Sequence, residues 1–461
     1  KRPPLEFVGD LLSNQCFSTN TAIHPFLRDG DNQYIITIYN GGIKVFNLSG
    51  TEQTTTISSG SSYLATTNPK NDFRFVSVGD YTFILNKSIK PAMAATTSAA
   101  KVNEALVYIK NANYGRTYSI TLTHPSMNSG NAVTSSFTMP AGDDVATQGG
   151  LRDTAKIATA IRTHSGGSPG TTGGTALNAS PISSYFTVTQ YDSVIHIKPT
   201  DNNANFTITT ADGAGDTAMY AVRDEVNDFT KLPYYGPIGA IMKVTGDEGQ
   251  VDSEYYVKFE GNGVWSETIA PGTTTSLDAA TMPHAIVRNA NGTFTYAPLT
   301  WIDRKAGDTD TNPDPTFIGK TCNNISFYKN RLVLLADENI IFSEAGSYYN
   351  FFATSVAAQL ATDMIDLAAT SNEVSILKHV IPYNEELLLF SDRAQFKVQS
   401  SEAALSPTGT GISLSTRFEH DPTVEPVGAG NYIYFTQNKG DKTALREYFV
   451  EPDTTNNDSV D

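Results

Sequence analysis

"RLVLLADENIIFSEAGSYYNFF", residues 331–352, contains two apolar segments separated by a short acidic stretch around Ala336 and Asp337. Runs of Leu, Val, Ile and Phe of this length are typical of β-strands, and an Asp in a tight turn accepts hydrogen bonds from backbone N–H groups two residues further on. The stretch therefore predicts a β-hairpin that bends at Ala336 and Asp337. The aromatic residues that follow, and the lack of an obvious catalytic side chain, favour a structural role.

The same plan recurs on both sides of this hairpin. "LLLFSDRAQFKV" places Ser391 and Asp392 between two apolar strands, as the first hairpin places Ala336 and Asp337. In "YIITIYNGGIKVFNLSG", we expect Asn40, Gly41 and Gly42 to supply the positive φ angles that tight primed turns require. Further turns are predicted at Gly79 and Asp80, at Asn262 and Gly263, and near Gln437.

The spacing of these turns predicts the architecture. Gly41 and Asp80 lie 39 residues apart, Asp337 and Asp392 lie 55 apart, and Gln437 follows 45 residues later. Periods of roughly 40 to 55 residues with several strands each are typical of propeller blades. We therefore predict a mainly β protein with a propeller-like body of antiparallel hairpin blades. The alternative is an irregular array of β-meanders that does not close.

An insertion interrupts the rhythm, because Asp80 and Asp337 are separated by 257 residues. It contains strand-like segments and one amphipathic segment, "GLRDTAKIATAIRTHS", with Leu151, Thr154, Ala158 and Ile161 at helical spacing. The Gly-rich stretch "SGGSPGTTGGTALNAS" that follows predicts a flexible loop. We therefore predict four parts: first blades in residues 1–97, an inserted α+β platform-type module in 98–232, a small β unit in 233–316, and further blades in 317–461.

The charge of the chain limits its function. Its 48 acidic and 32 basic side chains give a formal net charge of −16, which disfavours tight, sequence-independent binding of nucleic acid. An acidic wall is still compatible with a conduit along which DNA slides, and equally with a surface that aids solubility. The two cysteines, Cys16 and Cys322, provide neither a disulfide framework nor a cysteine metal site. No apolar run approaches the length of a bilayer span.

Motifs that suggest chemistry are weak. Ser168 in "GGSPG" matches the G-x-S-x-G elbow of hydrolases, but it follows a helix and precedes Pro169, so we expect no nucleophile there. Asp308, Asp310 and Asn312 alternate as calcium ligands do, yet Pro313 stands where such a loop needs Gly. A Pro-fixed turn whose side chains cap backbone groups is the expected alternative.

The histidines are scattered and none pairs with another at metal-ligand spacing, which predicts structural or surface roles. They are His24, His124, His164, His196, His284, His379 and His420. We therefore predict no catalytic, cofactor-binding or metal-ligating residues, no cofactor and no enzymatic activity. Tyr348, Tyr349, Phe351 and Phe352 could stack on sugars, but aromatic residues after a strand more often pack between sheets or subunits.

Several segments together carry a resemblance to a known family. They are "KRPPLEFV", "NPKNDFRFVSVGDYTFILN", "TMPHAIVRNANGTF", "GDTDTNPDPTFIGK", "FYKNRLVLLADENIIFSEAGSYYNFF", "PYNEELLLFSDRAQF" and "VGAGNYIYF". In this order the chain resembles the tail nozzle proteins, or tail tubular proteins B, of short-tailed podoviruses of the autographivirus type. Between about Ser88 and Phe229 little beyond "YGR" matches that pattern.

The resemblance implies a structural virion protein of the viral tail, assembled in the host cytoplasm. It implies a hexameric ring whose lumen carries double-stranded genomic DNA outward without specific binding. The expected partners are further copies of the chain, the tail adaptor (tail tubular protein A), the tail fibres and the host cell surface. Family members extend beyond both ends of this sequence, so we expect a fragment truncated at both ends. The alternatives are a virion-associated glycan-binding or glycan-hydrolysing tail protein, and a free-standing propeller that binds another protein.

Overall fold

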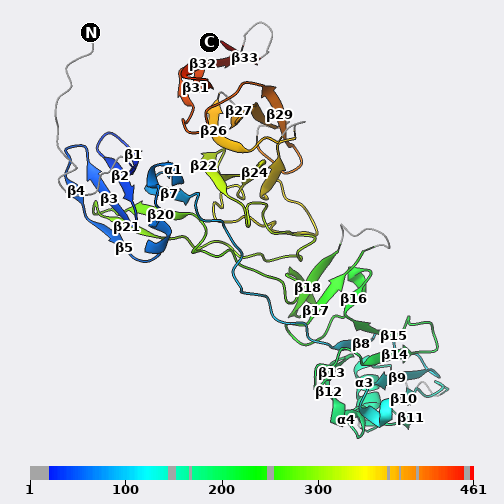
Figure 1. Ribbon diagram of the computed structural model, residues 1–461. Helices are drawn as coiled ribbons and strands as arrows, with labels where there is room; N and C mark the ends of the chain where they lie inside the picture. The colour runs from blue at the N-terminus through cyan, green and yellow to red at the C-terminus, as the bar shows by residue number, and fades with distance from the viewer. Residues whose placement is uncertain are drawn as a thin grey trace.

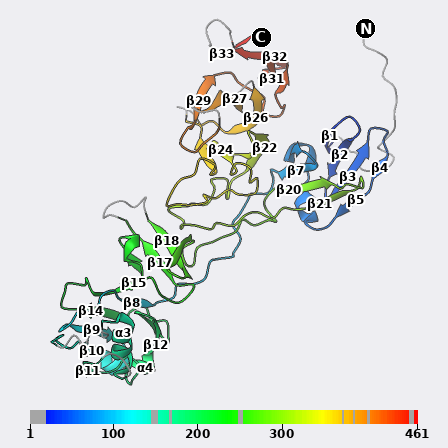
Figure 2. The same ribbon diagram turned by 180° about the vertical axis from the view of Figure 1, so that it is seen from behind.

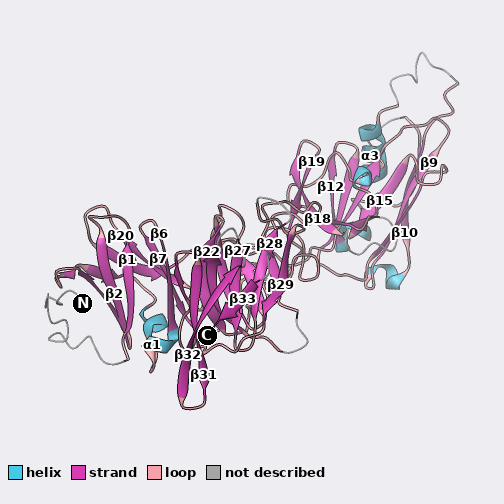
Figure 3. Ribbon diagram, turned by 90° about the horizontal axis from the view of Figure 1, so that it is seen from above, coloured by secondary structure: helices cyan, strands magenta, loops and turns pink. Residues whose placement is uncertain are grey.

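The computed structural model describes residues 20–143, 152–165, 169–246, 254–370, 374–383, 386–400, 404–450 and 457–460. Strands predominate, most of them in antiparallel sheets, which confirms the prediction of a mainly β protein. Figures 1 and 3 show two parts: a row of sheets, here called the body, and a projecting part between β8 and β19, here called the arm. Among the described residues, no helix is long and apolar enough to cross a bilayer.

The body begins with two sheets that contain the N-terminal strands. The first sheet consists of β1 (Ala22–Leu27), β2 (Gln33–Tyr39), β3 (Gly42–Asn47) and β4 (Glu52–Gln53). The second has the order β5 (Thr55–Ile57), β21 (Phe294–Pro298), β20 (His284–Arg288), β7 (Tyr81–Asn86) and β6 (Phe73–Val78). Two short helical turns, η2 (Ser61–Leu64) and α1 (Pro69–Asp72), lie between β5 and β6. The second sheet therefore joins strands from before and after the insertion.

Three further sheets follow, each with four strands in chain order. The third sheet contains β22 (Cys322–Tyr328), β23 (Arg331–Ala336), β24 (Asn339–Phe342) and β25 (Ile365–Ala368). The fourth contains β26 (Leu377–Tyr383), β27 (Glu386–Ser391), β28 (Gln395–Ser400) and β29 (Thr410–Thr416). The fifth contains β30 (Val427–Ala429), β31 (Tyr432–Lys439), β32 (Lys442–Val450) and β33 (Asn457–Val460).

The five sheets stack face to face through four apolar cores. In β23, Val333 and Leu335 face the core shared with the fourth sheet, whereas Leu332 and Leu334 face the core shared with the second. Since successive side chains in a strand point to opposite faces, burial on both faces explains the unbroken apolar run. Burying each such side chain stabilises the fold by about 1.5–3 kcal/mol. Further cores join the first sheet to the second and the fourth to the fifth.

Four of the sheets are meanders of the kind expected for blades. Edge strands β1, β6, β22, β26 and β30 lie next to one another along one side of the stack. Stacking of the sheets does not by itself close them into a propeller, so the propeller stays a prediction.

The arm is an α+β unit built on two sheets, with α3 (Thr154–Thr163) packed between them. One sheet has the order β11 (Thr171–Gly174), β10 (Val133–Thr138), β9 (Thr117–Thr123) and β14 (Thr207–Ala211). The other has the order β12 (Phe186–Tyr191), β13 (Val194–Pro199), β8 (Ala105–Ile109), β15 (Met219–Arg223), β16 (Glu225–Val226), β17 (Ile241–Val244), β18 (Tyr255–Gly261) and β19 (Val264–Thr268). The short turns η3 (Met127–Gly130), α4 (Ile182–Tyr185) and η5 (Phe229–Lys231) complete it. Because the second of these sheets crosses residue 232, the proposed boundary there divides a continuous sheet; the four-part division stays a prediction.

The predicted helix is present, with one difference at its start. It begins at Thr154, where the Asp153 carboxylate accepts the backbone N–H groups of Ala155 and Lys156. Ala158 and Ile161 are buried as predicted, whereas Leu151 lies outside the described residues.

The predicted flexible loop after the helix was wrong in part. Residues 171–174 form β11, which pairs with β10, because a Gly-rich strand needs only backbone groups to join a sheet. A Cβ at Gly174 would lie 2.1 Å from the Thr134 carbonyl oxygen, so a residue without a side chain suits this pairing.

The hairpins are present, and several turns are displaced from their predicted positions. In the hairpin of residues 331–342, Ala336 pairs with Asn339, so the turn residues are Asp337, with φ 50°, and Glu338. The turn predicted near Gln437 lies at Gly440 and Asp441, because Lys439 pairs with Lys442. Of Asn40, Gly41 and Gly42, only Gly41 has a positive φ, 79°.

Candidate functional site

The residues that suggested chemistry have structural partners. Asp308 accepts the backbone N–H groups of Asp310 and Thr311 at 3.0 and 2.9 Å, and the Thr311 hydroxyl at 2.9 Å. Burial alone would raise the pKa of Asp308, but the hydrogen bonds from Thr311 and Asp310 outweigh burial and lower it. Asn312 donates to the carbonyl groups of Ala306 and Ala353, both at 3.0 Å. The side chains thus cap backbone groups, as the alternative to a calcium loop predicted.

Nothing in the described ranges groups three or more His, Cys, Asp or Glu side chains as a metal site would need. Each histidine has a partner close by; His124 approaches Asp201 at 3.2 Å, and His196 approaches Glu104 at 2.7 Å. Cys322 is buried, and burial raises the pKa of its thiol to about 12. Ser168 and Cys16 lie outside the described residues.

The aromatic run after β24 belongs to the body core. Phe351 and Phe352 are fully buried between the second and third sheets. Phe351 packs against Trp301 and Phe317, with ring centroids 5.8 and 5.3 Å away. Because these rings are covered, they are not a surface for stacking sugars, and the prediction of packing between sheets is confirmed for them.

The arm is attached to the body by two antiparallel segments, residues 92–99 and 272–278, here called the stem. Figures 1 and 2 show both segments running from the body to the arm. Backbone hydrogen bonds join them: Ser98 N–H donates to Thr273 O at 2.9 Å, and Thr275 N–H donates to Thr96 O at 3.0 Å. A pair of bonded segments resists bending better than a single linker, so the stem holds the arm in a defined direction.

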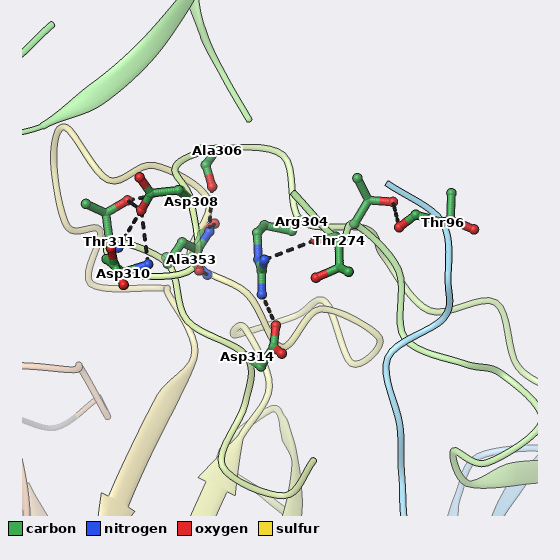
Figure 4. A network of polar contacts seen from close by, with 11 residues as sticks. Thr96, Thr274, Arg304, Ala306, Asp308, Asp310, Thr311, Asp314 and Ala353 are labelled. Atoms are coloured by element: carbon green, nitrogen blue, oxygen red, sulfur yellow. Dashed lines mark hydrogen bonds and ion pairs between the residues drawn. The ribbon is translucent and has the colours of Figure 1, made fainter. Parts of the chain in front are cut away.

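Arg304 fastens the stem to the body, and its side chain is buried (1% exposed). Its backbone N–H donates to Thr275 O at 2.8 Å, and Nη1 donates to Thr274 O at 3.0 Å. Nη2 pairs with the Asp314 carboxylate, and the guanidinium lies 4.8 Å from the centre of the Phe352 ring. Figure 4 shows the guanidinium between Thr274 and Asp314. One side chain therefore joins the stem, the 304–314 loop and the core of the body.

A second contact joins β19, the last strand of the arm's eight-stranded sheet, to the body. The Glu267 carboxylate, on β19, accepts the N–H groups of Val356 and Ala357 at 2.7 and 3.3 Å. It also accepts the Ser355 hydroxyl at 2.6 Å. These three donors belong to the loop between β24 and β25. The base of the arm is thus held by two ionised side chains, Arg304 and Glu267, on opposite sides of the contact.

This junction is the candidate functional site. Its role is to hold the arm in a fixed position on the body. The charged groups of Arg304 and Glu267 are both engaged in hydrogen bonds that hold the arm against the body. No sequence motif marks Arg304 or Glu267. The partners of Glu267 are 88 to 90 residues away, and those of Arg304 are a backbone carbonyl group 30 residues away and Asp314, whose spacing of ten residues matches no recognised pattern.

Comparison with known proteins agrees with a structural role. The sequence matches the family described as bacteriophage nozzle protein over residues 1–461. The chain belongs to that family. It is also 32% identical to tail tubular protein gp12 of Escherichia phage T7 over 464 residues, which is 99% of this chain and 55% of that protein. The chain thus spans about half the length of this curated relative. As a member of the nozzle family, it is a structural component of a phage tail.

Two solved structures give low similarity scores. A chain of the yeast heterotrimeric nucleoporin complex is 11% identical with a TM-score of 0.20, covering 93% of this chain and 98% of that one. The surface component PorZ of the type-IX secretion system of Porphyromonas gingivalis is 10% identical with a TM-score of 0.16, covering 93% and 59%. At these scores neither likeness carries an argument about the nozzle protein.

Proposed function

We propose that six copies of the chain, within the longer protein, form a ring-shaped tail nozzle through which genomic DNA leaves the virion. The match to the nozzle family along residues 1–461 is the observation that carries this proposal. The proposed role is structural and not enzymatic. Its partners are further copies of the chain, the tail adaptor, the tail fibres, the passing DNA and the host cell surface.

The packing of the sheets in the body supports the proposal of a rigid structural role. Five sheets share four apolar cores, so displacing any of the three inner sheets would expose apolar surface on both of its neighbours. The edge strands β1, β6, β22, β26 and β30 are neighbours in that order, and this adjacency supports the proposal that the sheets are blades around one axis. A propeller completed by the rest of the protein or by neighbouring copies is part of this proposal.

The charge of the chain favours a conduit whose wall does not bind DNA. A net charge of −16 gives little non-specific affinity for phosphates, because such affinity comes from counterion release at clustered Lys and Arg. DNA that is not held by the wall passes along it more freely. The arm, held rigidly by its junction, would reach from such a ring toward a neighbouring copy or another tail protein.

The mass of the assembled protein tests this proposal first. The full-length product is measured by size-exclusion chromatography with light scattering, alone and mixed with the tail adaptor. A mass of six chains, alone or only with the adaptor, is expected. Monomers under both conditions would overturn the ring.

A further inference from the structure

A small cleft in the body gathers three cationic side chains. Its volume is about 210 Å³, and its lining includes Arg74, Lys87, Lys378 and Asn323. Since one water molecule occupies about 30 Å³ of liquid, this space holds several waters or one hydrated ion. In a chain with a net charge of −16, three cations around one small cleft form a local positive site that would attract an anion.

The lining side chains come from three sheets. Arg74 lies on β6 and Lys87 directly follows β7, both in the second sheet. Asn323 lies on β22 of the third sheet, and Lys378 lies on β26 of the fourth. The cleft therefore lies at the seam where β6, β22 and β26 are neighbours. Anything bound there contacts three sheets at once.

The positive charges are poorly compensated. Within the described ranges, neither Lys87 nor Lys378 has an ion-pair partner within 4.0 Å. Arg74 donates through Nη1 to Asn71 O and Phe73 O at 3.2 and 2.8 Å, but its buried Nε has no hydrogen-bond partner.

Two nearby carboxylates compensate the three cations only in part. Glu425 and Asp72 attract Arg74, but among the described residues neither carboxylate lies within ion-pair distance of any of the three cations. Burial, followed by repulsion from Arg74, lowers the pKa of Lys87 to about 8. Attraction by Asp72 opposes this shift, and Lys378 adds to the repulsion. An excess of positive charge therefore remains in the cleft.

His379 forms an uncharged wall of the cleft. It is buried, and Nε2 donates to Pro422 O at 3.0 Å, which holds the loop that closes the site. Burial lowers the pKa of His379 to about 3, so the ring is neutral near neutral pH. It supplies a hydrogen-bonded support for the lining and adds no further charge.

We propose that this cleft is an anion site that takes a phosphate-type oxyanion and bridges the second and fourth sheets. Three cations exceed what a single carboxylate needs and match a tetrahedral group with several charged oxygens. An oxyanion there would contact Arg74 and Lys87 on one side and Lys378 on the other. Free phosphate and the DNA backbone share this chemistry.

Binding would stabilise the seam, because a ligand that binds only the folded state shifts the folding equilibrium toward it. The site does not depend on ring formation, since every lining residue belongs to one chain. The proposal can therefore be tested on the full-length protein, whatever its state of assembly.

The test compares thermal unfolding in sodium phosphate and in sodium chloride at equal ionic strength, which controls for general screening. The double variant Lys87→Gln with Lys378→Gln removes two of the three cations. Lys110→Gln, at an exposed position on the arm, is the matched control. We expect a saturable, phosphate-specific rise of the unfolding midpoint in the wild type and in Lys110→Gln, and its loss in the double variant.

Direct titration with phosphate in a calorimeter gives a second readout, in which the double variant should bind at least tenfold more weakly. In chloride alone the double variant should be as stable as the wild type or more so, since repulsion between cations is relieved. If it does not fold, Lys378→Gln alone is used in the titration. No phosphate-specific rise in the wild type, or an equal rise in the double variant, would overturn the site.

A short DNA duplex distinguishes the source of the oxyanion. A duplex that competes with phosphate, and loses affinity in the double variant, identifies the DNA backbone as the ligand. Phosphate binding that a duplex leaves unchanged identifies a small free oxyanion as the ligand.

Discussion

Two buried arginines show different ways of compensating a charge in the body. Arg331 donates to four carbonyl groups, those of Ser343, Asp363, Ala361 and Leu405. Arg304 instead has the Asp314 carboxylate and one carbonyl group. A buried cation that loses its compensating partner costs more than the loss of the pair as a whole. The two members of the Arg304–Asp314 pair should therefore respond unequally to substitution.

We predict that Asp314→Asn destabilises the chain more than Arg304→Met. Asp314→Asn leaves a buried guanidinium without its carboxylate, at a cost of about 2 kcal/mol, less than for a fully buried pair because Asp314 is partly exposed. Arg304→Met keeps apolar contact with Phe352 and leaves Asp314 to water, at about 1 kcal/mol. Denaturant unfolding measures both.

Asp310→Asn, at an exposed carboxylate on the same loop, is the control and should change stability by less than about 0.5 kcal/mol. The opposite order, with Arg304→Met clearly the worse variant, would show that the guanidinium matters for packing more than for charge.

Stability should fall as the pH drops from about 6.5 to about 4. His284 is fully buried, and burial lowers its pKa to about 4 from an ordinary value near 6.5. Between these values the unfolded chain binds a proton that the folded chain does not, so folding weakens as pH falls. The contribution of His284 is present above about pH 6.5 and amounts to about 3 kcal/mol at most.

Denaturant unfolding at several pH values checks this, with His284→Gln as the comparison. His24 and His379 have lowered pKa values too, so part of the loss stays in the variant. An equally steep pH dependence in wild type and variant would contradict the assignment to His284.

At the scale of elements, local sequence predicted the hairpins better than their turns. Alternation of apolar strands with Gly, Asn and Asp located hairpins correctly, because each strand and its turn are contiguous. At Asp337 and Gly440 the turn lies beyond the predicted position, since the pairing of the two strands of the hairpin decides which residues are turn residues. Where Asn262 and Gly263 both have positive φ, 51° and 75°, the prediction was right.

Pairing between distant strands could not be predicted. β7 pairs with β20, from the other side of the insertion, and β8 pairs with β15 across most of the arm. Both pairings depend on which apolar faces meet, which no local pattern encodes. The junction residues Arg304 and Glu267 were missed for the same reason.

We predict that Gly263→Ala destabilises the arm more than Gly272→Ala. Both glycines have φ near 75°, which costs an alanine about 1 kcal/mol. At Gly263 a Cβ would also lie 2.2 Å from the Tyr234 ring, whereas at Gly272 nothing lies within 4 Å. Displacing the ring should add about 1 kcal/mol. Thermal unfolding of both variants measures the difference, and equal costs would mean that Tyr234 moves away freely.

At the scale of the molecule, the direction of the arm depends on few contacts. The stem supplies backbone hydrogen bonds, Arg304 fastens the stem, and Glu267 holds the loop between β24 and β25. The apolar cores of the arm are separate from those of the body, and the apolar anchoring of the stem comes from Leu277, which is buried in the core between the second and third sheets. Backbone hydrogen bonds between residues 268–270 and Gly307 add one further contact. The orientation of the arm should therefore be sensitive to single polar substitutions that leave both parts folded.

We predict that Glu267→Ala loosens the junction without unfolding either part. The loop loses the acceptor for two backbone N–H groups and one hydroxyl, and hydrogen bonds to a charged group contribute about 1.5–3 kcal/mol. Amide hydrogen exchange at Val356 and Ala357 should become roughly tenfold faster or more, since 1.4 kcal/mol corresponds to a factor of ten. Exchange in the cores of the arm and body should be unchanged.

Glu260→Ala is the matched control, because Glu260 lies on the same hairpin and its partners, Lys258 and Ser266, are on that hairpin as well. It should leave exchange at Val356 and Ala357 at the wild-type rate. If both variants speed exchange equally, the hairpin as a whole and not the Glu267 carboxylate holds the loop. If neither does, the Glu267 carboxylate does not hold the loop. The arm is then fixed by the stem, Arg304 and the backbone pairing of residues 268–270 with Gly307.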